Sequence, residues 1–318
     1  MSAATNHPLV PGAYAATLTF FGDDESVDIE SLRTHITRLA RAGLSGIVVL
    51  GSNGEAAHLS DDEKYLVTST VRHVLDDTGF EQMPVIAGAS AQSAQECIRL
   101  CKHSAKAGAS HVLVLPPSYY KAAMSPDIIF DFYQKVANNS PLPVIIYSFP
   151  AVAGDINLSS DLILRISQHP NVIGTKFTCG DCGKLARVAR EMNASTPGHL
   201  NHYWAVGGLA DFTLPALVAG GSGVIAGGAN LAPRLCVKII ELFQKGDWRE
   251  AMRYQAVLSQ GDWVHTTAGI GATKALVQHH FHYGGAPRHP LQMPSTEALQ
   301  ALVASSSEMM EVEASLGE

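Results

Sequence analysis

Eight short apolar runs, each followed by a segment with helical periodicity, repeat along most of this 318-residue chain. The runs are continuous rather than alternating, as is typical of parallel strands whose two faces are both covered. We predict strands at 14–19, 46–50, 84–87, 111–115, 143–147, 172–176, 202–206 and 223–226. Eight strand–helix units within roughly 230 residues favour a closed (β/α)8 TIM barrel of the α/β class over an open doubly wound sheet.

The helical segments between and after these strands complete the pattern. They are predicted at 28–42, 61–75, 93–107, 126–137, 160–168, 183–192, 211–219 and 232–243. The rest of the chain, from Trp248 on, has a helical pattern with a Pro/Gly-rich break at 284–294. We therefore expect a barrel domain at 11–246 and a C-terminal helical appendage at 247–318 that packs on it. Its last dozen residues, rich in Ser and Glu, are expected to be frayed.

Lys176 is the residue on which the functional prediction depends, because it ends the sixth predicted strand. In such a barrel the loops after the strands form one mouth, where chemistry collects. A lysine amine that loses its water shell favours the neutral, nucleophilic form. The alternative is a structural ion pair with a carboxylate such as Asp181. Seven other lysines lie on predicted amphipathic helical faces, namely Lys64, Lys102, Lys106, Lys135, Lys184, Lys238 and Lys245.

Two further features are predicted at the same mouth. Tyr147 ends the fifth predicted strand as Lys176 ends the sixth, so we expect the two side chains to be neighbours. A phenol beside an amine can relay protons, although an aromatic residue at a strand end can also fill the core. The segment GSNGE at 51–55 offers a hydroxyl and backbone N–H groups that could accept a carboxylate, or it is an ordinary Asn-Gly turn.

Charge and hydropathy exclude several classes of function. A net charge of -7, a pI near 6.0 and the lack of a long Lys/Arg run argue against nucleic-acid binding. No apolar run reaches the length of a membrane span, and the N-terminal segment lacks the pattern of a secretion signal. The five cysteines, an odd number, fit free thiols better than a disulfide framework. We expect a cytoplasmic protein, with the mitochondrion as the open alternative.

Three cofactor-like patterns carry less weight. Cys179 and Cys182 have redox-motif spacing, but no second cysteine pair accompanies them, so we expect no metal. Gly221-x-Gly223-x-x-Ala226 matches a dinucleotide fingerprint, yet a strand falls inside it, which argues against a nicotinamide cofactor. Glycines at 207, 208, 227 and 228 keep a phosphate cradle open. The histidines at 279, 280, 282 and 289 are expected to have surface or packing roles.

Five motifs lie at or just after predicted strands, namely GSNGE at 51–55, PPSYY at 116–120, YSFP at 147–150, GTK at 174–176 and GGSGVIAGGAN at 220–230. In this order they make the sequence, over roughly residues 11–291, resemble the dihydrodipicolinate synthase / N-acetylneuraminate lyase family of class I aldolases. The resemblance implies a (β/α)8 barrel in which Lys176 forms a Schiff base with pyruvate or with the 2-oxo group of a larger acid. It implies neither a cofactor nor a metal.

The resemblance also implies roles for other residues. Ser52 and Asn53 match the pair that holds the pyruvate carboxylate, and Tyr147 matches the proton relay. Tyr120 is similar to the tyrosine that reaches into a neighbouring subunit's site, which implies a homodimer or a homotetramer built from dimers. The spacing has an extra residue here, so Tyr119 stays an alternative. Two more residues are expected to contact substrate hydroxyls, namely Thr178 and Gly208.

Departures from the family pattern concern the substrate. Val152 stands where dihydrodipicolinate synthases have an arginine for the carboxylate of aspartate semialdehyde, and Phe177-Thr178 replaces the usual Asp-Ser after the lysine. The GSN and YSFP segments are closer to the 4-hydroxy-2-oxoglutarate aldolase and 2-keto-3-deoxy sugar-acid aldolase branches. We therefore predict cleavage of such an acid to pyruvate plus an aldehyde. The alternatives are a synthase-type condensation and a barrel that binds 2-oxo acids without turnover.

Overall fold

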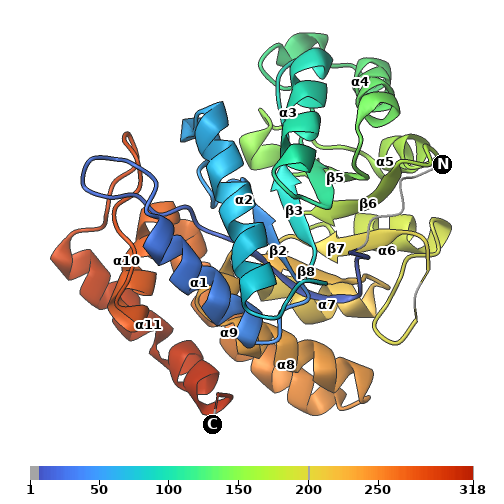
Figure 1. Ribbon diagram of the computed structural model, residues 1–318. Coiled ribbons are helices and arrows are strands. Elements are labelled where there is room, and N and C mark those ends of the chain that lie inside the picture. The colour runs from blue at the N-terminus through green and yellow to red at the C-terminus, as the bar shows by residue number, and fades with distance from the viewer. Residues whose placement is uncertain (1–6, 200, 318) are drawn as a thin grey trace.

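Eight parallel strands close into a barrel in chain order, with β1 pairing to both β2 and β8. The computed structural model describes residues 7–199 and 201–317, and Figure 1 shows the strands surrounded by helices. The strands are β1 (Gly12–Ala16), β2 (Gly46–Val49), β3 (Val85–Gly88), β4 (His111–Val114), β5 (Val144–Ser148), β6 (Val172–Phe177), β7 (Trp204–Gly207) and β8 (Gly223–Ala226). The predicted (β/α)8 TIM barrel is confirmed.

One helix follows each strand and covers the outside of the barrel. The helices are α1 (Ile29–Arg41), α2 (Asp61–Asp77), α3 (Ala94–Lys106), α4 (Pro126–Asn139), α5 (Ser160–Ile166), α6 (Cys182–Glu191), α7 (Thr213–Val218) and α8 (Pro233–Gln244). The first six begin at a Ser or Asp whose side chain accepts a backbone N–H of the first turn. Each such cap stabilises its helix by about 1 kcal/mol and defines where the preceding mouth loop ends.

Most predicted elements differ from the structure by one or two residues at an end, and two of them differ in a way that has a clear cause. β1 begins and ends earlier than the predicted 14–19, because the chain leaves the sheet after Thr17, whose N–H still donates to the Val48 carbonyl. The predicted helix 211–219 is a short 3-10 turn, η4 (Ala210–Phe212), followed by α7. Pro215 lies in the first turn of α7, where its missing N–H costs no hydrogen bond.

Three helices follow the barrel, namely α9 (Trp248–Ala268), α10 (Ile270–Phe281) and α11 (Thr296–Ser315). In Figure 1, α10 and α11 lie beside α1 at one side of the barrel. The expected fraying of the last dozen residues is wrong, because α11 continues to Ser315 and buries Glu313. The Glu313 carboxylate accepts the N–H groups of Arg234 at 3.1 Å and Leu235 at 2.9 Å. It thereby caps α8, which has no side-chain cap of its own.

Side chains fill the barrel interior and leave only its mouth open for chemistry. The inward-facing cluster consists of Tyr14, Ala16, Val48, Ile86, Leu113, Ile145, Tyr147, Trp204, Val206 and Ile225. Tyr14 and Trp204 meet edge to face with ring centroids 4.8 Å apart, which closes the lower part of the barrel. The outward-facing strand residues pack against the helices.

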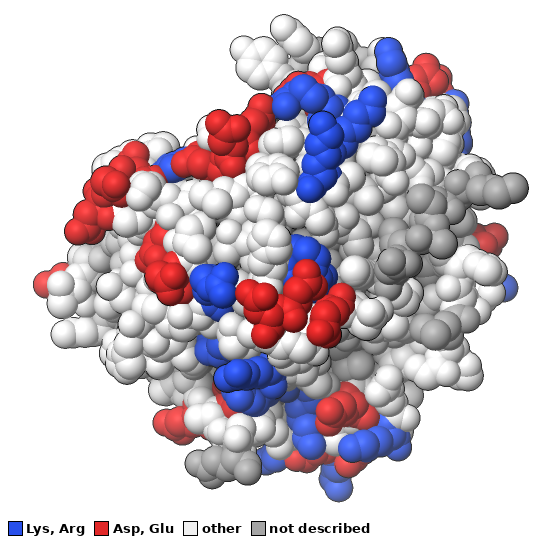
Figure 2. Space-filling model, in the orientation of Figure 1, with Lys and Arg blue, Asp and Glu red and all other residues white. Residues whose placement is uncertain are grey.

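The surface is mixed in charge. On the face shown in Figure 2, Lys/Arg and Asp/Glu side chains are interspersed rather than gathered into a patch of one sign. No helix within residues 7–199 and 201–317 has the length and apolar character that a membrane crossing requires.

Candidate active site

Lys176 and Tyr147 meet at the mouth of the barrel. Their positions pair directly in the register of β5 and β6, so both side chains leave the sheet at the same level. Lys176 is 3% exposed, and its Nζ lies 3.4 Å from the Tyr147 Oη and 4.5 Å from the centroid of that ring. The prediction that the two residues are neighbours is confirmed. The amine and the phenol are within proton-transfer reach of one substrate oxygen.

The structural alternative for Lys176, an ion pair with Asp181, is not formed. The Asp181 carboxylate caps α6 through the N–H of Lys184 and lies 4.0 Å from the Nζ of that residue. Among the residues that the structure describes, no carboxylate forms an ion pair with Lys176. Lys184 itself corrects the prediction of a solvated helical face, because it is buried and its Nζ donates to Asn157 Oδ1 at 2.5 Å.

The loop after β2 holds its backbone in an unusual conformation. Leu50 and Glu55 have left-handed backbones, with φ of 56° and 51°, and they bracket Gly51 to Gly54. Such a conformation costs a non-glycine residue about 1 kcal/mol or more, so surrounding contacts must maintain it. Within the described part of the chain, no protein acceptor takes the N–H of Ser52 or Asn53. These two groups are available to an anion, as the predicted carboxylate nest requires.

A cavity of about 470 Å³ opens beside this loop and beside Tyr147. Its volume lies in the range of small-molecule sites. Two predicted residues line it, Ser52 and Tyr147, together with Val152 at the position of the missing arginine. The wall also includes Ser90, which follows the third predicted strand, and three polar residues that the sequence prediction missed, namely His58, Lys64 and Gln92. Since these residues lie in loops and at helix ends, no hydrophobic period marks them as facing the cavity.

Lys176 is not itself among the residues that line this cavity, but Tyr147, which does line it, lies 3.4 Å from the Lys176 Nζ. The other predicted site residues do not line it either, namely Asn53, Thr178, Gly208, Tyr119 and Tyr120. Thr178 and Gly208 are in direct contact, since a Cβ on Gly208 would lie 1.9 Å from Thr178 Oγ1. Tyr119 and Tyr120 are 79% and 70% exposed and pack edge to face at 5.0 Å. The roles expected for these residues, and for Asn53, whose Nδ2 lies 3.4 Å from the Ala16 carbonyl, stay predictions.

A third buried lysine, Lys274, supports the site from outside the barrel, and the sequence prediction did not consider it. Lys274 of α10 is fully buried, and its Nζ lies 2.5 Å from Oε1 of Glu55. Burial lowers the pKa of Lys274 even though the Glu55 carboxylate opposes that shift. The signal in the sequence is a single lysine inside the apolar segment IGATKALV at 270–277.

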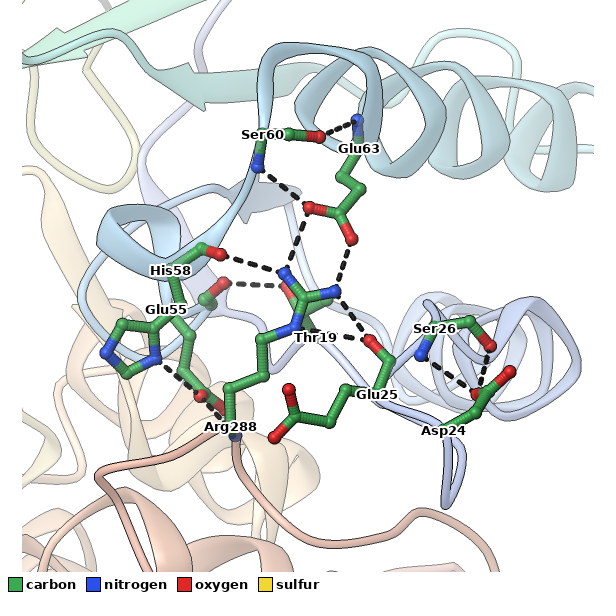
Figure 3. A network of polar contacts seen from close by, with 10 residues as sticks. Thr19, Asp24, Glu25, Ser26, Glu55, His58, Ser60, Glu63 and Arg288 are labelled. Carbon is green, nitrogen blue, oxygen red and sulfur yellow. Dashed lines mark hydrogen bonds and ion pairs between the residues drawn. The ribbon is translucent and has the colours of Figure 1, made fainter.

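Arg288 joins the same loop to the C-terminal segment, as Figure 3 shows. Its guanidinium donates to the carbonyl oxygens of His58 at 2.8 Å and Glu25 at 2.6 Å, and to Glu63 Oε2 at 2.9 Å. The hydrogen bond from Arg288 lowers the pKa of Glu63 to about 2. The loop that carries Ser52 and Asn53 is therefore fastened on two sides by residues beyond the barrel.

The cysteines and the glycine-rich segment around β8 can be placed in the structure. The five cysteines are free, and β8 occupies Gly223–Ala226, inside the fingerprint-like segment rather than before it. In residues 7–199 and 201–317, no group of three or more His, Cys, Asp or Glu is arranged to hold a metal ion. The groups gathered at the mouth include the Lys176 amine, the Tyr147 phenol and the backbone N–H groups of Ser52 and Asn53.

Comparison with known proteins gives consistent similarities. Residues 10–308 match the family model described as the dihydrodipicolinate synthetase family. The chain is 47% identical to an L-threo-3-deoxy-hexylosonate aldolase of Aspergillus niger, over 97% of this chain and 98% of that protein. It is also 47% identical to a probable mitochondrial 4-hydroxy-2-oxoglutarate aldolase of Emericella nidulans, over 98% of both. The crystal structure of YagE from Escherichia coli K12 in complex with pyruvate aligns with a TM-score of 0.82 at 25% identity, over 98% of this chain and 99% of YagE.

Proposed function

We propose a specific reaction for this chain, which belongs to the dihydrodipicolinate synthetase family and is an aldolase. It cleaves a 4-hydroxy-2-oxo acid or a 2-keto-3-deoxy sugar acid to pyruvate and an aldehyde. One observation carries the proposal. The Lys176 amine is buried, has no ion-pair partner among the described residues and lies 3.4 Å from a phenol. An amine in that setting is suited to covalent catalysis on a ketone.

The proposed mechanism uses the geometry directly. The Lys176 amine adds to the C2 ketone, and loss of water leaves an iminium. Tyr147 gives its phenolic proton to the hydroxyl that leaves as water. The resulting phenolate then accepts the proton of the C4 hydroxyl, and the electrons of the C3–C4 bond move into the iminium as the aldehyde departs. The remaining enamine takes a proton at C3, and hydrolysis of the resulting iminium releases pyruvate and the free amine. The substrate carboxylate lies against the N–H groups of Ser52 and Asn53.

The cavity wall supports a polyhydroxy or hydroxy acid rather than aspartate semialdehyde as the reaction partner. Val152 is 44% exposed on that wall, and its isopropyl group cannot pair with a carboxylate. The side chains of His58, Ser90 and Gln92 provide hydrogen-bonding groups for hydroxyls on the same wall. Which aldehyde is released depends on these contacts.

Two measurements test this function. Pyruvate followed by borohydride is expected to leave a reduced adduct on Lys176, located by peptide mass spectrometry. Condensation of pyruvate with glyoxylate, glyceraldehyde and aspartate semialdehyde then ranks the acceptors. Absence of the adduct contradicts the mechanism, and a preference for aspartate semialdehyde supports the synthase alternative. An adduct without turnover on any 4-hydroxy-2-oxo acid supports a barrel that only binds 2-oxo acids.

We also propose a homodimeric unit in which Tyr120 enters the partner's site. Two adjacent exposed tyrosines form an apolar patch on the loop after β4. The Gln92 side chain fixes this loop by accepting the N–H groups of Ser118 and Tyr119. Sedimentation of the protein before and after Tyr120→Asp tests the interface, with Tyr65→Asp as the control at another exposed tyrosine.

The compartment is part of the same proposal. We keep the cytoplasm, supported by the five free cysteines, against the mitochondrial location in the name of the E. nidulans relative. Fractionation of cells that express the untagged protein distinguishes the two.

A further inference from the structure

We propose that Glu55 is a positioning residue for the carboxylate-binding loop, and that Lys274 of α10 supplies the charge that holds Glu55 in place. The inference rests on the proposed function, because it assigns the loop at 51–55 to the substrate carboxylate. It adds that the helices beyond the barrel take part in the site rather than only covering it.

The loop needs such a support because both of its ends have left-handed backbones. Leu50 and Glu55 adopt φ of 56° and 51° without the freedom that glycine has. Little space is available around the turn, since a Cβ on Gly54 would lie 3.1 Å from both the Leu50 nitrogen and the Thr17 carbonyl oxygen. A conformation of this kind persists only where neighbouring contacts over-determine it. The N–H groups of Ser52 and Asn53 lie between these two residues, so their direction depends on both ends.

Glu55 is the residue through which those contacts act. Its side chain is buried, with Oε1 at 2.5 Å from the Lys274 Nζ. Oε2 accepts the N–H of Arg288 at 3.0 Å and lies 3.1 Å from His58 Nδ1. Figure 3 shows the Glu55 carboxylate between the imidazole of His58 and the backbone of Arg288. On the opposite side of the loop, the Thr19 hydroxyl donates to the Gly54 carbonyl at 2.7 Å.

Lys274 is the partner whose ammonium group lies in direct contact with the carboxylate, whereas Arg288 contacts it through a backbone N–H. Lys274 is fully buried, with its Nζ 4.3 Å from the Phe21 ring centroid and 3.3 Å from the Ala286 carbonyl. Removal of one member of a buried ion pair leaves the other charge without compensation in a medium of low polarity. A carboxylate in that position would move toward water or become protonated, and either change would turn the loop.

His58 extends the consequence to the cavity. Its imidazole lines the cavity wall while its Nδ1 is held by the same carboxylate. Glu55 therefore controls two surfaces that a bound acid meets, the N–H groups at its carboxylate and the imidazole at the wall. A merely structural ion pair would contribute to stability without changing how the site responds to pyruvate.

The experiment measures the rate of borohydride-trapped adduct formation on Lys176 as a function of pyruvate concentration, which needs no aldehyde. Lys274→Met is expected to raise the half-saturating pyruvate concentration by roughly tenfold or more, with the rate at saturation much less affected. The double variant Lys274→Met/Glu55→Gln removes both charges and is expected to recover much of this loss. If Lys274→Met does not fold, Glu55→Gln alone is used, because it breaks the same ion pair from the loop side and is expected to raise the half-saturating concentration likewise.

Glu313→Gln is the matched control, because Glu313 is a buried carboxylate that accepts backbone N–H groups at α8 and does not contact the loop. It is expected to keep the wild-type dependence on pyruvate. The inference is overturned if Lys274→Met, or Glu55→Gln where Lys274→Met fails to fold, shows lowered thermal stability but the wild-type half-saturation. It is equally overturned if Glu313→Gln shifts the half-saturation as far. Absence of any adduct in the wild-type protein would instead contradict the proposed function.

Discussion

Two buried lysines differ in what surrounds them. Lys274 is fully buried and lies 2.5 Å from a carboxylate that is also fully buried. Lys176 is 3% exposed, and its Nζ lies 3.4 Å from the phenolic oxygen of Tyr147. A buried charge is stable when it is paired and hydrogen-bonded, and costly when it is not. The ion pair of Lys274 therefore stabilises the folded state, whereas the burial of the unpaired Lys176 amine costs free energy that other contacts must offset.

The position of the two lysines in the barrel explains the difference. Lys176 ends a strand at the mouth, where the adjacent strand ends in Tyr147. Lys274 lies in a helix outside the barrel and meets the loop after β2 from behind. A catalytic group that has no counter-ion in a buried position lowers the stability of the folded state, and paired groups around the site must offset that cost. This relation leads to four predictions.

The largest effect is expected from removing each lysine in turn. Lys176→Met should abolish the borohydride adduct and lower kcat/KM by at least roughly 10³-fold, because Lys176 carries the amine that lies 3.4 Å from the Tyr147 phenol. The same change should cost little stability, since it removes a buried amine without a counter-ion. Lys274→Met should cost about 3–5 kcal/mol in urea unfolding, because Glu55 is left unpaired.

Lys184→Met is the control for this pair. Lys184 is buried and hydrogen-bonded to Asn157, but its contacts do not reach Tyr147. It should keep the adduct. The comparison fails if Lys176→Met destabilises the protein as much as Lys274→Met does.

Tyr147→Phe should have the second largest effect. Loss of the phenolic oxygen removes the proton acceptor for the C4 hydroxyl, so we expect kcat to fall by roughly 10²- to 10³-fold. The adduct with pyruvate should still form, more slowly, because Lys176 is intact. Single-turnover trapping separates the two steps. A variant that retains full turnover would remove Tyr147 from the mechanism, and Tyr133→Phe, at a buried tyrosine packed outside the barrel, is the control.

Sequence patterns could predict the unpaired lysine but not the paired one. Lys176 and Tyr147 are predictable because the repeat of strand and helix places consecutive strand ends side by side, and local register does the rest. Lys274 is not, because its partner Glu55 lies far away in the chain and the helix around it has no polar face. The same reason applies to Glu313. Its carboxylate is buried because it accepts N–H groups at the start of α8, and the Ser/Glu-rich sequence around Glu313 gives no sign of that distant partner.

Cavity walls are the second part that the sequence could not supply. His58 and Gln92 reach the cavity from a short 3-10 turn and from a loop, where neither the helical nor the strand period fixes side-chain direction. The resemblance to a family directed attention to Ser52 and Asn53 in the same loop. It did not indicate that the C-terminal segment also contributes Ile270 and Leu291 to the wall.

A further variant adds a positive charge at the mouth, whereas the lysine variants each remove one. Val152→Arg places a guanidinium on the cavity wall at a position that is partly exposed and can accommodate it. We expect the ratio of kcat/KM for glyoxylate to that for glyceraldehyde to rise about tenfold, because the guanidinium can pair with the acceptor's carboxylate. Val152→Gln, of similar length and without charge, should leave the ratio near that of the wild type. An unchanged ratio in Val152→Arg would mean that the acceptor's carboxylate lies elsewhere.

The smallest effect is expected at an unpaired charge that lies outside the cavity wall. Burial and the neighbouring Asp262 carboxylate raise the pKa of Asp211, in η4, from 3.8 to about 6. The native state thus holds this proton more tightly than the unfolded chain does, so its stabilising effect is complete below about pH 4 and is lost as the pH rises through 6. Asp211 is only half-buried, so solvent screening reduces the effect to about 1 kcal/mol.

Asp211→Asn should therefore raise the free energy of unfolding by that amount at pH 7.5 and leave it unchanged near pH 4, as urea unfolding at both pH values would measure. Since Asp211 is not on the cavity wall, kcat should stay within about twofold of the wild type. A large loss of kcat would show that the Asp211 carboxylate contributes to the chemistry although it is not on the cavity wall. The difference between Lys176 and Lys274 could then not be explained by their immediate neighbours alone.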